Sequence, residues 1–426
     1  MNERFDAIVV GAGVAGLAAA AELRRRGLTC VILEATARIG GRAQTAYPPE
    51  LGGAAFDLGA SWLHAAERNP LTEIAHHHGD GLRDANATRR RRLLVDEREA
   101  TAAESDGWDR AYAAFEDYAS RRAKQEPDIS FSEAMVPLRD DPWTATIETW
   151  EARNIAAADP AHFSLRDWHV NALEGSNLSV DGGIGAFVLR RLVPPAGEIR
   201  LNAPVIGIDW SDGVAVDTDA ARLHAAAVIV TVSTGVLAAG GIGFAPMLPA
   251  SHRQAIVGLP MGLLTKIALP ATDRLGMPGD LSIRRQLRDG EFSMSFHFWP
   301  EGRDHVVGFV GGPAAWALAS EELLGGDVEA FARAQLNLLL GEGADRNFGP
   351  GVVSHWGTDP AYRGAYCYAT PGHFGARAAL GLPLGGGRLC FAGEAVRSDG
   401  LAGTVAGAYL SGMDAAGLAA AVIRRP

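Results

Sequence analysis

Near the start of the chain, apolar and glycine positions follow one another in an order that predicts a strand, a helix and a second strand. Residues 7–10 (AIVV) form a short apolar run typical of a strand buried on both faces. The alanine-rich segment 17–23 predicts a helix that ends at Arg24 to Arg26 and Gly27, because cations and glycine favour helix C-termini. A second apolar run, CVIL at 30–33, ends at Glu34. The pattern therefore predicts a βαβ unit.

Three glycines lie in the turn between the first strand and the helix. Gly11 suits a tight turn, Gly13 lets the backbone approach a diphosphate, and Gly16 lets the helix lie close to the strand. A helix that begins at this turn presents free N–H groups to a phosphate anion. Glu34 at the end of the second strand would accept hydrogen bonds from a ribose. The spacing therefore predicts a dinucleotide site rather than a plain glycine turn.

The remaining pattern divides the chain between two domains. Strands are predicted over 201–209, 213–217, 225–232 and 387–391, and helices over 186–192 and 404–423. A second group of strands over 261–269, 291–299 and 305–310, with a helix over 327–340, follows a tryptophan-rich helical block over 105–173. We therefore predict an α/β fold, in which residues 1–75, 196–258 and 385–426 form a Rossmann-like cofactor-binding domain. Residues 76–195 and 259–384 form an inserted α+β substrate-binding domain with a mixed sheet plus helices, in which Arg89 to Arg92 are predicted to be a solvated turn.

Composition narrows the class of protein. The chain has 426 residues, enough for two full cores, and a formal charge of −11, so we expect no nucleic-acid partner. Its three cysteines lie in apolar surroundings, which argues against a disulfide framework and for a reducing, cytoplasmic location. Asn2 and Glu3 run directly into the first strand, so no secretory signal is expected. The last helix ends in Arg424, Arg425 and Pro426, so no apolar stretch is expected to span a membrane. His76 to His78 lack metal-ligand spacing, and no metal is predicted.

Further motifs follow the first unit. They are Gly40-Gly41-Arg42, FDLGASWLH at 56–64, FAGE at 391–394 and GTVAGA at 403–408. Together they resemble the flavin-containing amine oxidase family along the whole chain. The resemblance implies that the Rossmann-like domain binds FAD noncovalently, because Tyr366 fills the position of the flavin-linking cysteine of monoamine oxidases and Cys367 is one residue off. The residues implied to bind the cofactor are Gly11, Gly13, Gly16, Glu34, Ala35, Gly41, Arg42, Gly59, Ala60, Ser61, Trp62, Val205, Trp356, Gly393, Glu394, Thr404 and Val405.

The resemblance also implies a catalytic set. Lys266, one of two lysines beside 37 arginines, lies in an otherwise apolar strand, where the family hydrogen-bonds a lysine through a water to flavin N5. Burial lowers the pKa of a lysine, and its ammonium is compact, so arginine would not serve there. Tyr366 would form an aromatic wall beside the flavin, supported by Trp356, and would favour a neutral amine.

Three further positions complete this set. Thr404 replaces the second tyrosine of the monoamine oxidase cage, and with Val405 it would present helix N–H groups to the flavin N1–C2=O edge. His64 matches a histidine at the mouth of the site in animal polyamine oxidases, where it could orient a substrate nitrogen. Glu174 is a candidate for holding a distal ammonium.

These expectations define an FAD-dependent amine oxidase. Hydride would pass from the α-carbon of a neutral amine to flavin N5, giving an imine and then a carbonyl compound plus an amine or ammonia, while O2 becomes H2O2. The expected substrate is a polyamine or other primary or secondary amine, and the chain is expected to be a monomer or homodimer. An L-amino-acid oxidase is an alternative, although no arginine can be assigned to its substrate carboxylate. A flavin-dependent desaturase resembling protoporphyrinogen oxidase is another.

Overall fold

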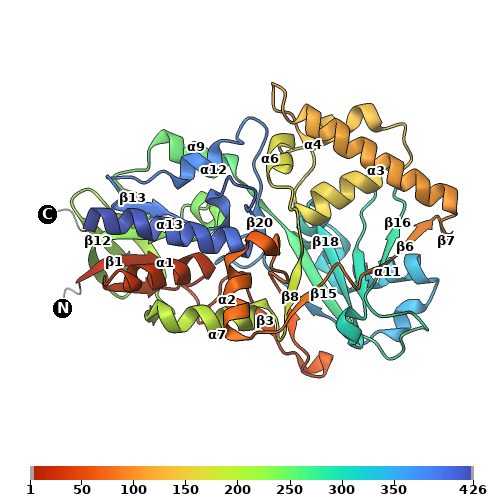
Figure 1. The fold of residues 1–426 in the computed structure, drawn as a ribbon, viewed down its shortest axis with the longest axis horizontal. Coiled ribbons are helices and arrows are strands. Elements are labelled where there is room, and N and C mark those ends of the chain that lie inside the picture. The colour runs from red at the N-terminus through yellow and green to blue at the C-terminus, as the bar shows by residue number, and fades with distance from the viewer. Residues whose placement is uncertain (1–3, 424–426) are drawn as a thin grey trace.

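The computed structural model describes residues 4–423, which form two lobes lying side by side (Figure 1). The sequence segments at Asn2–Glu3 and Arg424–Pro426 lie outside the described residues. Each lobe is built on one large sheet, and both sheets collect strands from distant parts of the chain. The division agrees with an α/β domain interrupted by an inserted α+β domain.

The first lobe is built on an eight-stranded sheet with a parallel centre. Val10 of β1 lies beside both Leu33 of β2 and Val230 of β12. These central parallel strands are buried on both faces, which explains why their sequences are continuous apolar runs. In the described residues the order is β13 (Gly243–Ala245), β10 (Val205–Asp209), β11 (Val214–Thr218), β12 (Arg222–Val230), β1 (Arg4–Val10), β2 (Cys30–Leu33) and β9 (Glu198–Arg200), with β21 (Leu389–Phe391) also paired to β12.

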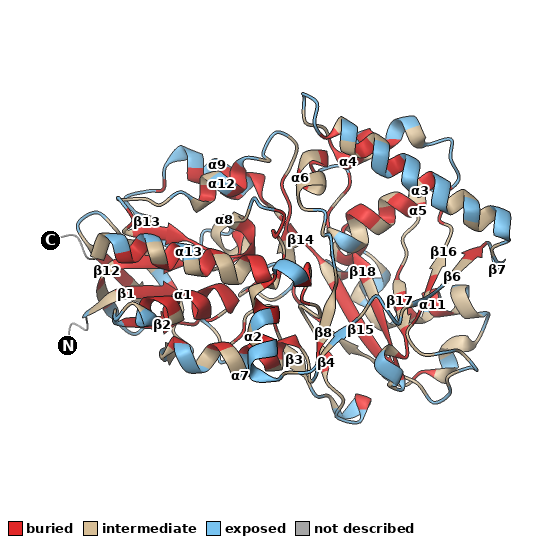
Figure 2. Cartoon of the chain, in the orientation of Figure 1, coloured by how far each residue is buried: buried red, intermediate tan, exposed pale blue. Residues whose placement is uncertain are grey.

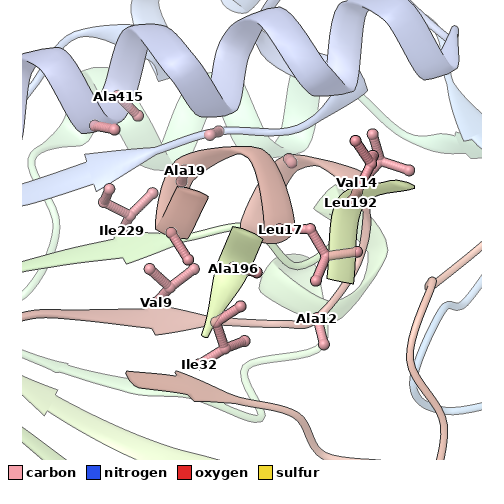
Figure 3. Close-up of a cluster of buried hydrophobic side chains, with 14 of the residues drawn as sticks. Val9, Ala12, Val14, Leu17, Ala19, Ile32, Leu192, Ala196, Ile229 and Ala415 are labelled. Atoms are coloured by element: carbon pink, nitrogen blue, oxygen red, sulfur yellow. The ribbon is translucent and has the colours of Figure 1, made fainter. Parts of the chain in front are cut away.

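Different helices cover the two faces of this sheet because side chains alternate along each strand. Val9 joins a cluster with α1 (Val14–Arg25), α2 (Pro70–His78), α7 (Ile184–Ala196) and α13 (Val405–Ile423). Figure 3 shows Val9 with residues of α1, α7 and α13. Ile8 packs on the other face with α9 (Ala250–Gly258) and α12 (Ala376–Gly381), and α8 (Thr234–Ala238) lies nearby. Figure 2 shows the strands and the inner sides of these helices as buried. The predicted βαβ unit is therefore the centre of the lobe.

Helix α13 packs unusually close to α1. A Cβ at Gly412 would lie 2.1 Å from the backbone oxygen of Ala15, so small residues let the two helices touch. By length and composition alone, α13 could also cross a membrane, contrary to the expectation that no stretch would qualify. The core helix of a folded domain passes the same test, and α13 packs one face into the core of the first lobe. Helix α7 also packs on α1, so the last part of the range 76–195 lies with the first sheet.

The second lobe has a seven-stranded sheet and a helical layer. Among the described residues its strands run β19 (Val352–Val353), β15 (Leu264–Pro270), β18 (His305–Gly311), β17 (Ser295–Phe298), β16 (Leu281–Arg285), β6 (Arg90–Val95) and β7 (Arg98–Glu99). The helices are α3 (Ala102–Arg122), α4 (Phe131–Met135), α5 (Thr144–Glu148), α6 (Leu165–Val170), α10 (Pro313–Ala319) and α11 (Val328–Leu340), and a π-helix spans Thr149–Ile155. Short pairs join β3 (Thr45–Ala46) to β4 (Phe56–Asp57), β5 (Leu82–Asp84) to β8 (Leu178–Val180), and β14 (Met261–Gly262) to β20 (Tyr366–Cys367).

The prediction of a solvated turn at Arg89 to Arg92 is wrong. Residues 90–95 form β6, which pairs in parallel with β16, so that Arg90 lies beside Leu281 and Leu94 beside Arg285. Leu94 is buried and packs in the core of this lobe, which explains why the segment forms a strand despite its charge. Arg89, just before the strand, is largely buried. Strands β9 and β16 were also not predicted.

Candidate active site

A single large cavity of about 1130 Å³ runs between the two lobes. Its lining includes every predicted site residue except Gly16 and Glu174, together with residues from the second sheet and the helical layer. A typical small-ligand pocket has roughly 300–1,000 Å³, so this cavity has room for an extended cofactor and a second molecule. Segments far apart in the sequence therefore meet around one space.

The glycines at the start of α1 form a close-packed phosphate-type turn. Gly11 has a φ of +101°, and a Cβ at Gly16 would lie 1.9 Å from the backbone oxygen of Gly11, so both positions require glycine. Gly13 faces Gly41 of the second glycine motif, where a Cβ on Gly41 would lie 3.1 Å from the Gly13 Cα. The two glycine loops together leave a backbone surface that a diphosphate can approach.

Glu34 lies at the edge of this surface and is held in place. One carboxylate oxygen accepts a hydrogen bond from the Ala12 N–H at 2.8 Å, and the other accepts from the N–H and hydroxyl of Thr36 at 2.9 and 2.8 Å. Ala35 and Val205 line the cavity beside it. An acid so placed after the second strand fits the predicted ribose contact.

Arg42 and Glu394 join the two ends of the chain. The Arg42 guanidinium donates to Glu394 Oε1 at 2.9 Å and to the backbone oxygen of Ala365 at 2.7 Å. Glu394 also accepts from the Cys367 backbone N–H at 3.2 Å, while Gly393, with a φ of +139°, makes the turn before it. These contacts fix the Arg42–Glu394 ion pair in the cavity lining, next to the glycine loops.

The loop from Gly59 to Trp62 is pressed against the cofactor side of the cavity. A Cβ at Gly59 would lie 1.8 Å from the Arg42 backbone oxygen, so this close approach requires glycine. The Trp356 indole N–H donates to the backbone oxygen of Leu58 at 2.9 Å and fixes the start of the loop. Gly59, Ala60, Ser61 and Trp62 all line the cavity.

Lys266 lies directly under this loop, in β15. Its ammonium donates to the backbone oxygens of Asp57, at 3.1 Å, and Gly59, and to the hydroxyl of Ser61. The residue is 4% exposed, and burial lowers the pKa of Lys266 to about 8, with the Asp57 carboxylate opposing the shift. Trp62 lies beside it, because the Lys266 Nζ is 5.8 Å from the centre of its ring. Lys266 is therefore a buried cation at the boundary of the two lobes.

Tyr366 and Thr404 also line the cavity, and the hydroxyl of each donates a hydrogen bond to a backbone oxygen. The Tyr366 hydroxyl donates to the backbone oxygen of Ile155 at 2.6 Å, which fixes the ring. The Thr404 hydroxyl donates to the Leu401 backbone oxygen at 2.7 Å and accepts from the Gly407 N–H at 3.0 Å, so it caps the start of α13. Val405 begins the helix.

Three expectations about individual residues need correction or refinement. Glu174 is exposed and does not line the cavity, so it cannot hold a distal ammonium there. Trp356 contacts the ring of Tyr362, at 5.1 Å, and supports the Gly59 loop rather than Tyr366. His64 does line the cavity, and its Nδ1 lies 2.5 Å from Asn177 Oδ1, while burial lowers its pKa.

Several charged residues in the cavity were missed in the sequence. Arg89 lies 5.9 Å from the Trp62 ring centre, and Arg284 is held between Trp108 and Trp150 at 4.6 and 4.0 Å. Glu151, in the π-helix, accepts from Tyr112 and, at 3.0 Å, from the Trp168 indole N–H. Burial raises the pKa of Glu151. These residues come from parts of the chain that are distant in sequence: Arg89 directly precedes β6, Arg284 lies in β16, which pairs with β6, and Glu151 lies in the π-helix.

The residues present fit FAD. The paired glycine loops, Glu34 and the Arg42–Glu394 pair suit its dinucleotide half, and the Gly59 loop with Lys266 and Thr404 suits the ring. In residues 4–423, no group of three or more His, Cys, Asp or Glu is arranged to hold a metal ion. The fold and site thus define a dinucleotide-dependent oxidoreductase.

The family can be named from the sequence itself. The profile of the flavin containing amine oxidoreductase family matches residues 85–420, and that of an NAD(P)-binding Rossmann-like domain matches residues 9–77. The chain belongs to the flavin-containing amine oxidoreductase family, its cofactor is FAD, and it is an FAD-dependent amine oxidase.

Known relatives agree with this placement. The chain is 28% identical to polyamine oxidase 4 of Oryza sativa subsp. japonica over 96% of its own length and 87% of the relative's. It is 30% identical to lysine-specific histone demethylase 1 homolog 2 of Arabidopsis thaliana over 95% of its length but 57% of that protein's. A solved putrescine oxidase bound to putrescine has the same fold, with a TM-score of 0.81, 23% identity and full coverage of both chains.

Proposed function

We propose that this chain oxidises a small primary or secondary amine and reduces O2 to H2O2. Bound FAD supplies the hydride acceptor for the carbon next to the amine nitrogen, and water then splits the oxidised amine into a carbonyl compound and an amine or ammonia. The side chains of the protein bind and orient the amine, exclude water and hold a proton at Lys266 Nζ.

The arrangement of Lys266 under the Gly59 loop carries this proposal. Lys266, Trp62 and Tyr366 all line the cavity between the lobes, and the Lys266 ammonium lies 5.8 Å from the centre of the Trp62 ring. Aromatic faces attract an amine but solvate its charged form poorly, which favours the neutral amine from which hydride can leave. The Tyr366 ring is kept in place by its hydrogen bond to Ile155.

The identity of the amine stays a prediction. The rice relative is named a polyamine oxidase and the solved relative binds putrescine, which makes polyamines and diamines the first compounds to test. An L-amino-acid substrate is a second candidate because Arg89 lines the cavity. A desaturase would have no use for the combination of Lys266 and Tyr366. We also propose a cytoplasmic location, supported by three buried, unpaired cysteines, and a monomer or homodimer.

Two measurements test the proposed reaction. A peroxide-coupled screen of monoamines, diamines, polyamines and amino acids should find at least one substrate, and failure of every amine to bleach the flavin anaerobically would contradict amine oxidation. Lys266→Met should retain FAD but slow flavin turnover, whereas Lys124→Met, at an exposed site, should not. Unchanged rates in both half-reactions of Lys266→Met would remove Lys266 from the mechanism.

A further inference from the structure

Arg89 lines the cavity, and its side chain has no hydrogen-bonding or ion-pair partner among the described residues. Within residues 4–423 its side chain makes no hydrogen bond or ion pair, and its Nε is buried with no acceptor. The guanidinium lies 5.9 Å from the centre of the Trp62 ring, and Lys266 Nζ lies 5.8 Å from the same ring centre. Arg89 therefore lies close to the reaction site rather than at the outer end of the cavity.

The charged neighbours of Arg89 do not neutralise it. Asp280 attracts it from beyond ion-pair distance and is engaged elsewhere, because its carboxylate accepts from the Glu301 N–H at 2.8 Å and lies 3.4 Å from His297 Nε2. Arg91 repels it. A largely buried cation without a counter-charge is costly, so an anion that enters the cavity gains a preformed partner.

Apart from Arg91, which is exposed, the arginines that line the cavity beside Arg89 on the second sheet already have partners for their charges. Arg92 pairs with Glu99, and Arg285 pairs with Glu291. Arg284 lies between the two indole rings of Trp108 and Trp150, which stabilise its cation. Glu151, a buried acid that also lines the cavity, already accepts hydrogen bonds from Tyr112 and from the Trp168 indole N–H.

We propose that Arg89 binds an anionic group of the substrate, so that the preferred amine carries a carboxylate. The proposal rests on the amine oxidation proposed above and names the substrate class of that site. A polyamine would instead bring further positive charge to a region that already holds Arg89 and Lys266. An amine with a carboxylate brings the neutral nitrogen to the flavin side and the anion to Arg89.

The test compares amines with and without the carboxylate. Anaerobic flavin reduction by the FAD-loaded enzyme yields a Kd for each amine. The matched pairs are leucine and isopentylamine, phenylalanine and phenethylamine, and γ-aminobutyrate and propylamine, and putrescine is tested as an amine with a second positive charge. For at least one pair, the carboxylate should tighten Kd by about 10- to 100-fold, as expected for a hydrogen-bonded charge pair. The pair that responds also reports the spacing between the amine and the anion.

Variants show whether Arg89 causes the difference. Arg89→Gln should weaken the Kd of the responding acid by about 10- to 100-fold and leave the Kd of its decarboxylated partner unchanged. Arg89→Lys should recover part of the loss. Arg90→Gln removes the same charge from the next residue, which is exposed and outside the cavity lining, and should change neither Kd. A titration with benzoate, followed by the flavin absorption spectrum, gives a second readout that needs no turnover.

The possible outcomes separate this proposal from the proposed reaction. Reduction by putrescine and simple amines but not by their carboxylate partners would overturn the anion site and leave amine oxidation standing. Equal weakening of both members of a pair in Arg89→Gln would also overturn it, since that is the effect of a structural residue. If no amine reduces the flavin but benzoate binds in an Arg89-dependent way, the anion site stands and the reaction fails. If Arg89→Gln does not fold, the proposal is tested by the ratio of the two Kd values of each matched pair, measured in wild type and in Arg89→Lys. A ratio that is the same in both proteins would overturn the anion site.

Discussion

The burial of Lys266 predicts a particular dependence of stability on pH. The residue is 4% exposed, and its ammonium donates to two backbone oxygens and the Ser61 hydroxyl under the Gly59 loop. Burial lowers its pKa from 10.5 to about 8. Lys266→Met keeps a side chain of similar length, removes the charge and thereby removes this titration from the folded protein.

The sign and size follow from proton binding in the two states. Between pH 8 and 10.5 the unfolded chain holds the proton on Lys266 while the folded chain has released it, so the free energy of unfolding rises with pH. One pKa unit corresponds to about 1.4 kcal/mol, which gives a gain of about 3 kcal/mol over this window. Below pH 8 both states are protonated and the gain is absent. Lys266→Met should show no such gain.

The assay is equilibrium urea unfolding of wild type and Lys266→Met between pH 7 and 10, at one saturating FAD concentration, followed by tryptophan fluorescence. The difference between the two unfolding free energies should grow with pH in favour of wild type. Lys124→Met removes the chain's other lysine from an exposed position and serves as the matched control. Parallel curves for wild type and Lys266→Met would refute the reasoning, because they would mean that Lys266 is not desolvated.

Three further substitutions test the Gly59 loop, the buried Asp167–Arg377 pair and the cap of α13. Gly59→Ala places a methyl group 1.8 Å from a backbone oxygen of the neighbouring loop and should abolish FAD retention, measured as flavin per protein, whereas Gly375→Ala has open space and should retain it. Asp167→Asn breaks a pair with Arg377 in which both side chains are 3% exposed, and should cost about 3–5 kcal/mol in urea unfolding; a loss below about 1 kcal/mol would mean that the pair is dispensable. Thr404→Ala removes the cap of α13 and should cost about 1 kcal/mol of unfolding free energy, which Thr404→Ser should restore.

The cofactor half of the site could be predicted because its signals are local. Gly11, Gly13 and Gly16 lie within one turn, and the apolar runs beside them form strands over nearly the predicted residues. The close contact of Gly16 with the Gly11 oxygen shows why the spacing is so restrictive. Glu34 follows directly from the end of the second strand. The resemblance to the family added the Gly59 loop and Lys266, which no local pattern identifies.

The substrate half could not be predicted because its contacts are distant in sequence. A run of four arginines is usually solvated, yet β6 is stabilised by parallel pairing with β16, nearly two hundred residues later. Nothing near Arg89 in the sequence indicates that its neighbour in space is Trp62. The π-helix that positions Glu151 likewise has no signal in the apolar pattern. The expectation for Glu174 was wrong for the opposite reason: it lies next to the cavity-lining Leu173 in sequence, yet it is exposed and does not line the cavity.

The distribution of charge pairs explains how one cavity can serve two ligands. On the cofactor side, Arg42 is paired with Glu394, and behind them Arg377 is paired with Asp167, so these charges hold three separated chain segments together before any ligand binds. On the substrate side, Arg89 has no such partner among the described residues. A cation that does not stabilise the fold is free to be used in binding, and its energy is realised only when an anion arrives. The specificity of the oxidase should therefore depend on Arg89, while retention of FAD should not.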